Sequence, residues 1–141
     1  MLLDELTKLI TDNATEFVLQ TSIFKGIENA ACQDTCTFVH ETGGLSPDFV
    51  FNSSNPVWEQ PSVQIINRST NYQTARNNAQ TIYNLLQQQA NVTLAPNTSA
   101  GASGALYYDI NPLQSPFLLG LDANQRIEIS CNYSIRKTLS T

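Results

Sequence analysis

A strict alternation of apolar and polar side chains near the end of the chain constrains the fold more than any other feature. Between Arg126 and Arg136 the apolar residues occupy every second position: Ile127, Ile129, Cys131, Tyr133 and Ile135. The positions between them carry Glu128, Ser130, Asn132 and Ser134. Because successive side chains of a strand point to opposite faces, this period of two predicts a half-buried antiparallel strand. The chain must therefore build a sheet with one covered face.

Two other segments have the period of a helix. In the first, apolar residues recur at steps of three and four: Leu3, Leu6, Ile10, Ala14 and Phe17. This stripe predicts an amphipathic N-terminal helix that frays near Asp12 and Asn13. A second stripe runs from Tyr72 to Ala90 and predicts a helix of about five turns that lies on the sheet. Thr70 and Gln73 have the spacing of a capping box at its start.

Shorter runs of β-forming residues predict further strands. Thr35–Glu41 is such a run and ends at Gly43 and Gly44, which favours a strand that stops there. Ser62–Arg68 is apolar on both faces and predicts a strand away from the sheet edge. Val92–Leu94 and Leu106–Ile110 are also expected as strands, whereas residues 16–24 allow either a short strand or continued helix.

Two stretches lack periodicity. Leu45–Gln60 carries Pro47, Pro56 and a pair of serines, and Ala95–Ser103 is rich in Pro, Asn, Ser and Gly. Both are predicted to be mobile, exposed loops, and loops of this length often make functional contacts. The element order predicts a single α+β domain over residues 1–141. Its sheet is mixed or mostly antiparallel, with an N-terminal helix and one long central helix packed on one face.

The charge balance narrows the possible functions. Seven Lys and Arg against twelve Asp and Glu give a net charge of −5, the wrong sign for a protein that binds nucleic acid by neutralising phosphates. Only 13% of the residues are charged, which suits a subunit covered by neighbours. The apolar runs are too short to cross a membrane, and the acidic start does not resemble a signal peptide, so we expect a cytoplasmic protein.

The residues that could carry chemistry do not form a recognisable site. Cys32, Cys36 and His40 are spaced by four, and Cys131 could complete a zinc site, but strand residues four apart span roughly 13 Å. We therefore expect reduced cysteines and no metal or other cofactor. Residues 101–104 lack the spacing of a nucleophile elbow, and nothing positions the acidic residues for acid–base catalysis, so no enzyme is predicted.

Four arginines are the candidate interface residues. Arg68 and Arg76 flank the start of the second helix, while Arg126 and Arg136 flank the last strand. Their guanidinium groups are either surface charges or, for Arg68 and Arg126 above all, partners of carboxylates on neighbouring subunits.

Four segments in order resemble the minor capsid and tail-terminator family of tailed bacteriophages. The first two are Phe38–Gly44 and Pro61–Arg68, and the others are Tyr72–Ala75 and Leu121–Tyr133. Members are similar in having a strand that closes on Gly-Gly, a P-x-V-Q strand that ends in Arg, a Tyr/Ala helix, and an Asp-turn-Arg before a Ser-x-Asn-aromatic strand. The resemblance covers roughly residues 24–136, and the Cys32–Cys36 segment departs from it.

The resemblance implies a structural virion protein. Proteins of this family form a ring, usually of six subunits, that caps the tail tube and joins it to the head. The implied partners are further copies of the chain, the major tail tube protein and a head-completion or neck protein, with DNA only passing through the lumen. The implied place is the virion, at the junction of head and tail, after assembly in the cytoplasm of a bacterial host. Two alternatives stay open: a head-completion or neck protein, and an unrelated small enzyme or ligand-binding domain.

Overall fold

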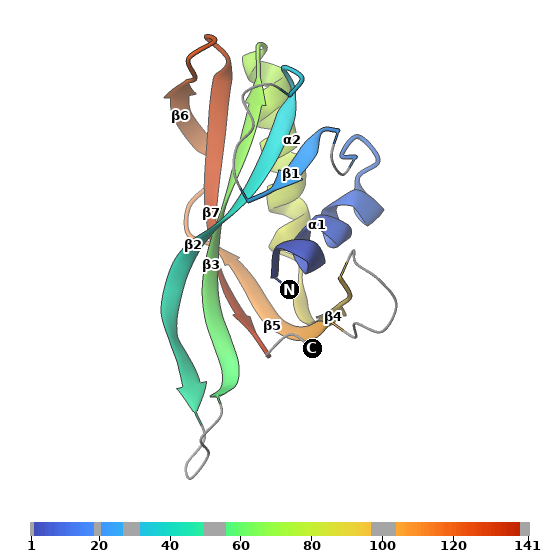
Figure 1. Ribbon diagram of the computed structural model, residues 1–141, viewed down its shortest axis with the longest axis vertical. Coiled ribbons are helices and arrows are strands. Elements are labelled where there is room, and N and C mark those ends of the chain that lie inside the picture. Colours follow the sequence, from blue (N-terminus) through green and yellow to red (C-terminus); the bar gives the residue numbers. More distant parts are fainter. Residues whose placement is uncertain (1, 19–20, 27–31, 50–55, 97–103, 139–141) are drawn as a thin grey trace.

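The structure is a computed structural model that describes residues 2–18, 21–26, 32–49, 56–96 and 104–138. One sheet of seven strands forms the body (Figure 1). The strands are β1 (Ile23–Lys25), β2 (Cys36–Phe49), β3 (Pro56–Ser69), β4 (Ala90–Leu94), β5 (Ala105–Pro112), β6 (Phe117–Leu121) and β7 (Ile127–Lys137). Their order is β1-β2-β3-β7-β5-β4, with β6 also paired to β7. Only the β1–β2 pair is parallel, so the predicted mixed, mostly antiparallel sheet is confirmed.

The alternating segment forms β7 at the centre of this sheet, as predicted. Its apolar residues Ile129, Cys131, Tyr133 and Ile135 are all buried. The whole strand pairs with β3 along one edge. Its other edge is shared, since β6 pairs with Ile127–Ser130 and β5 with Tyr133–Lys137. The sheet therefore divides beyond β7, with β6 at one end and β5 and β4 at the other (Figure 1).

Most of the stretch expected to be an exposed loop at Leu45–Gln60 is instead a two-stranded ribbon. β2 runs on through Gly43 and Gly44 to Phe49, and β3 begins at Pro56. Register shifts after Glu41 and Leu45 let the two strands stay paired despite the prolines. Both glycines have positive φ, so they bend the strand without ending it. Residues 50–55 lie outside the described part of the chain. We call residues 41–47 and 58–62 the arm; it extends from the body in Figure 1.

Two helices cover one face of the sheet, α1 (Leu2–Asn13) and α2 (Tyr72–Leu86) (Figure 1). Their buried residues join one core with the inward residues of β2, β3, β5 and β7: Leu6, Ile10, Ile82, Leu86, Val39, Ile65, Ile110 and Tyr133. The N-terminal helix ends where fraying was predicted. Two α-helices on one face of a sheet confirm the α+β class.

The prediction of one long central helix is wrong. α2 has 15 residues, against 14 in each of β2 and β3, so the sheet dominates the fold. The helix ends at Leu86 instead of Ala90: Gln87 is its C-cap, and Ala90 is the first residue of β4, which pairs with β5. Its N-cap is Asn71, whose side chain accepts from the amides of Gln73 and Thr74, so Thr70 is not the cap.

Polar contacts attach α1 to the sheet. The hydroxyl of Tyr107 on β5 donates to Oε1 of Glu5 at 2.8 Å, and both side chains are buried. Lys25 on β1 forms an ion pair with Asp4 in the first turn of α1. The helix is thus anchored at two strands that lie far apart in the sheet order.

Candidate subunit-contact sites

Arg68, at the end of β3, is buried inside its own subunit. Its side chain is 0% exposed, and the guanidinium carbon lies 5.0 Å from the centroid of the Phe38 ring. Its Nη2 donates to the carbonyl of Gln33 at 2.9 Å and to Sγ of Cys32 at 2.7 Å. Arg68 therefore holds the segment before β2 against the face of the sheet that α1 and α2 leave uncovered.

Arg126 is also buried, and Asp122 connects it to Arg68. In the turn between β6 and β7, the two carboxylate oxygens of Asp122 accept from the backbone amide and from Nε of Arg126, each at 2.8 Å. The carboxylate also lies 3.8 Å from Nη1 of Arg68, and Arg126 reaches Asp34 at 3.5 Å. Burial acts to raise the pKa of Asp122, but the hydrogen bonds and charge of Arg126 outweigh it and lower that pKa.

The interpretation of these arginines as surface charges is wrong for Arg68 and Arg126. The sequence did not reveal that Asp122 bridges the two arginines, because Arg68 and Arg126 are 58 residues apart in the chain and nothing local brings them together. The spacing Asp122-x-x-x-Arg126 across a turn was the one signal that could have indicated this ion pair. A contact from either guanidinium to a neighbouring subunit stays a prediction.

The other two arginines retain solvent exposure. Arg76, in the first half of α2, donates from Nη1 to Oε1 of Gln80 at 2.9 Å. Arg136 is exposed near the end of β7, and its guanidinium carbon lies 4.8 Å from the centroid of the Trp58 ring. Tyr108 meets the same indole edge-on at 4.9 Å. Arg136 and the arm thus share a cation–aromatic contact.

The potential metal ligands do not converge. Cys36 and His40 lie on the sheet face away from the helices, whereas Cys131 faces the core. Within the described residues, no group of three or more His, Cys, Asp or Glu side chains is arranged to hold a metal ion. Burial raises the pKa of the Cys36 thiol to about 12, with a further contribution from Cys32. This thiol is therefore protonated at neutral pH.

β6, a strand that the sequence did not predict, carries four of the eight exposed large hydrophobic residues in the described part of the chain. Along β6 the exposed fractions are 40% for Phe117, 58% for Leu118, 47% for Leu119 and 59% for Leu121. Pro112 and Pro116 interrupt the sequence pattern before this strand, and the uncharged apolar run after Pro116 was the signal that could have revealed it. β6 pairs with β7 alone, so its outer edge is open among the described residues.

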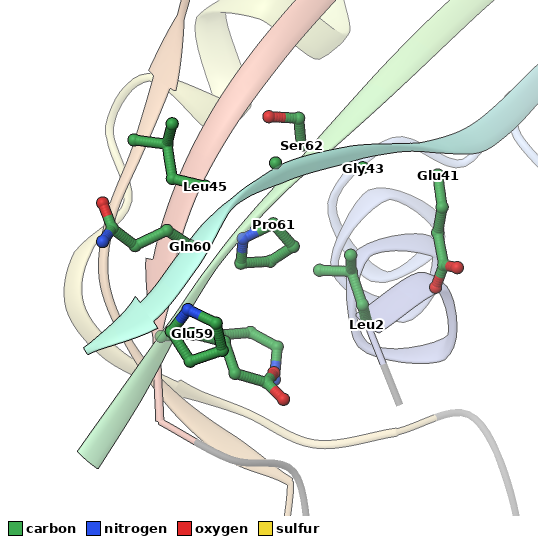
Figure 2. A pocket seen from close by; sticks show the side chains of 11 residues that line it. Leu2, Glu41, Gly43, Leu45, Glu59, Gln60, Pro61 and Ser62 are labelled. Atoms are coloured by element: carbon green, nitrogen blue, oxygen red, sulfur yellow. The ribbon is translucent and has the colours of Figure 1, made fainter. Parts of the chain in front are cut away.

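A pocket of about 580 Å³ lies at the base of the arm (Figure 2). Its apolar lining comes from Leu2 of α1 and from Leu45, Pro47 and Pro61 of the arm. In Figure 2, Pro61 lies between Leu45 and Leu2. Lys137 contributes charge, but its Nζ is paired with Glu59 at 3.0 Å. The pocket can accept apolar side chains beside polar backbone.

The features so far define a protein with contact surfaces: an open apolar strand, a protruding arm and an apolar pocket. The family model of the bacteriophage tail terminator protein matches residues 12–139. The chain therefore belongs to the bacteriophage tail terminator family, and it is a structural component of a phage tail. No curated protein matches the chain. The match leaves nearly all of α1 outside. Within the described residues, no helix is long and apolar enough to span a membrane.

Proposed function

We propose that this chain, acting as one domain, forms a ring that caps the tail tube, stops its polymerisation and joins the tail to the head. The observation that carries the proposal is the match to the tail terminator family over residues 12–139. The ring would contain six copies. Its partners would be the major tail tube protein on one side and a neck protein on the other, after assembly in the host cytoplasm.

The arrangement of exposed surfaces supports a subunit that is covered on several sides. The β3 side of the arm pairs with β7 at Glu59 and Ser62, whereas its β2 side has no strand beside it in the described part of the chain. We propose that the arm contacts the tube and neck, together with the segment 95–103, of which residues 97–103 lie outside the described part of the chain. Arg76 and Arg136, which keep solvent exposure, would pair with carboxylates of neighbouring subunits.

Net charge supports a passive role toward DNA. At −5, the chain repels phosphates, so a lumen of this composition would let DNA slide without sticking. The chain would then take part in DNA passage by shaping a channel, with no cofactor and no turnover.

The test is addition of purified chain to polymerising tube protein. We expect shorter tubes whose ends carry the chain, measured by electron microscopy and by co-sedimentation. Tubes of unchanged length with bare ends would refute the proposal. A chain retained in heads lacking tails, and absent from isolated tails, would instead identify a head-completion or neck protein.

A further inference from the structure

An open, apolar strand edge such as that of β6 is unusual on a surface that faces solvent. An uncharged apolar edge strand invites pairing with other chains, and proteins usually protect such edges with charges or prolines. Here Phe117, Leu118 and Leu119 run in sequence without a charge, and Leu113 is exposed nearby in the chain. Four of the five residues of β6 are exposed large hydrophobic residues, and because successive strand residues point to opposite faces, they present apolar surface on both sides of the strand. We therefore expect another protein chain to cover β6.

Identical copies of an acidic chain associate more readily where their contact avoids like charges. At a net charge of −5, two copies repel each other. β6 carries no ionisable side chain, so contact through it adds no charge repulsion. Burial of these side chains and of the open strand edge would supply part of the roughly 800 Å² that each partner buries in a stable interface.

The matching surface is the pocket at the base of the arm. Leu45 at its rim is 69% exposed, the largest value among the exposed large hydrophobic residues described. Gly43 has no side chain, and a Cβ there would meet nothing within 4 Å, so the strand surface is open to an approaching chain. β1 pairs with β2 only at Thr37–Val39, so the backbone edge of β2 along the arm has no strand beside it in the described structure. Pockets next to an open strand edge are how sheets bind an extended segment.

We propose that β6 of one copy docks at the arm base of the next copy, with Leu118 and its neighbours in the pocket beside Leu45. The two surfaces belong to different parts of the chain, since β6 lies near one end of the long axis and the arm extends toward the other (Figure 1), so the contact is head-to-tail. A head-to-tail contact that closes on itself makes a ring. The inference rests on the proposed ring and names the surfaces that hold it together.

Two variants and their mixture test this pairing. Leu118→Glu disables the docking strand, and Leu45→Glu disables the pocket rim. In sedimentation velocity, each variant alone should remain a monomer at concentrations where the wild type assembles. If the wild type assembles only on tube ends, each variant alone should form no ring there. The equimolar mixture retains one intact strand and one intact pocket, so its mass should double from 15.6 kDa and go no further. Val18→Glu, an exposed apolar residue outside both surfaces, is the matched control and should assemble as the wild type does.

The outcomes separate the interface from the function. Circular dichroism first establishes that each variant is folded, which their exposed positions favour. A mixture that stays monomeric, or single variants that still form rings, would overturn the proposed contact between β6 and the arm base. Neither result would count against the proposed capping of the tail tube. A wild type that never self-associates, alone or on tube ends, overturns the docking as well. Failure of the wild type to shorten tubes counts against the proposed function alone.

Discussion

Replacement of Tyr107 by Phe tests how the N-terminal helix is attached to the sheet. The Tyr107 hydroxyl is buried and donates at 2.8 Å to the buried carboxylate of Glu5 on α1. The substitution removes one oxygen and leaves the ring, so it creates almost no cavity. It leaves the Glu5 carboxylate with one donor fewer in a place that water does not reach.

A hydrogen bond to a charged group contributes about 1.5–3 kcal/mol, so Tyr107→Phe should lower the free energy of unfolding by that amount. For a domain of this size the loss corresponds to a fall in Tm of roughly 5–10 °C. Tyr108, the next residue, offers a matched control. Its ring contacts Trp58, and its hydroxyl makes no hydrogen bond within the described part of the chain. Tyr108→Phe should change the free energy of unfolding by less than about 0.5 kcal/mol.

Urea denaturation followed by far-ultraviolet circular dichroism measures both variants. We expect the midpoint of Tyr107→Phe to fall with an unchanged slope, because both states expose the same surface as in the wild type. Equal midpoints for Tyr107→Phe and Tyr108→Phe would refute the reasoning. In that case Glu5 would not depend on the tyrosine, and α1 would be held by apolar packing alone.

Three further predictions follow from the buried polar groups and the arm. Burial raises the pKa of Tyr107 and of Tyr133 above the ordinary value of about 10, so the folded chain keeps protons that the unfolded chain loses. Stability should therefore be complete below pH 10 and fall as pH rises above it, which urea midpoints across this range would show; a flat profile contradicts the burial. Asp122→Asn should lower Tm clearly more than Asp34→Asn, because Asp34 is largely exposed; differential scanning fluorimetry compares them, and equal shifts would count against the bridge. Gly44→Ala should lower Tm by several degrees in the same assay, since a Cβ there collides with a backbone carbonyl of β3, and a neutral result would mean that the arm is not paired as described.

Strong local periodicity explains what could be predicted. The alternation over residues 127–135 and the stripe of α1 are properties of consecutive residues, and both elements form where the pattern placed them. The α+β class and the tail terminator family followed from the order of such segments. Weak or interrupted patterns misled. Pro116 lies directly before β6 and suggested no strand there. Gly43 and Gly44 were expected to end β2, but β2 continues through them because it stays paired with β3.

The sequence by itself determined the elements whose residues carry their own signal: the amphipathic helices, the alternating central strand, and an acidic, weakly charged surface. Only the tertiary structure decided which polar groups are buried and which apolar groups are not. Arg68 and Arg126 are at strand and turn ends that suggested surface charge, yet Asp122 draws both into the subunit. Leu118 belongs to an uncharged apolar run, yet it is exposed on a strand that has a neighbour on one side only in the described structure. The physical reason is that burial depends on what packs from distant parts of the chain, and no local spacing encodes that.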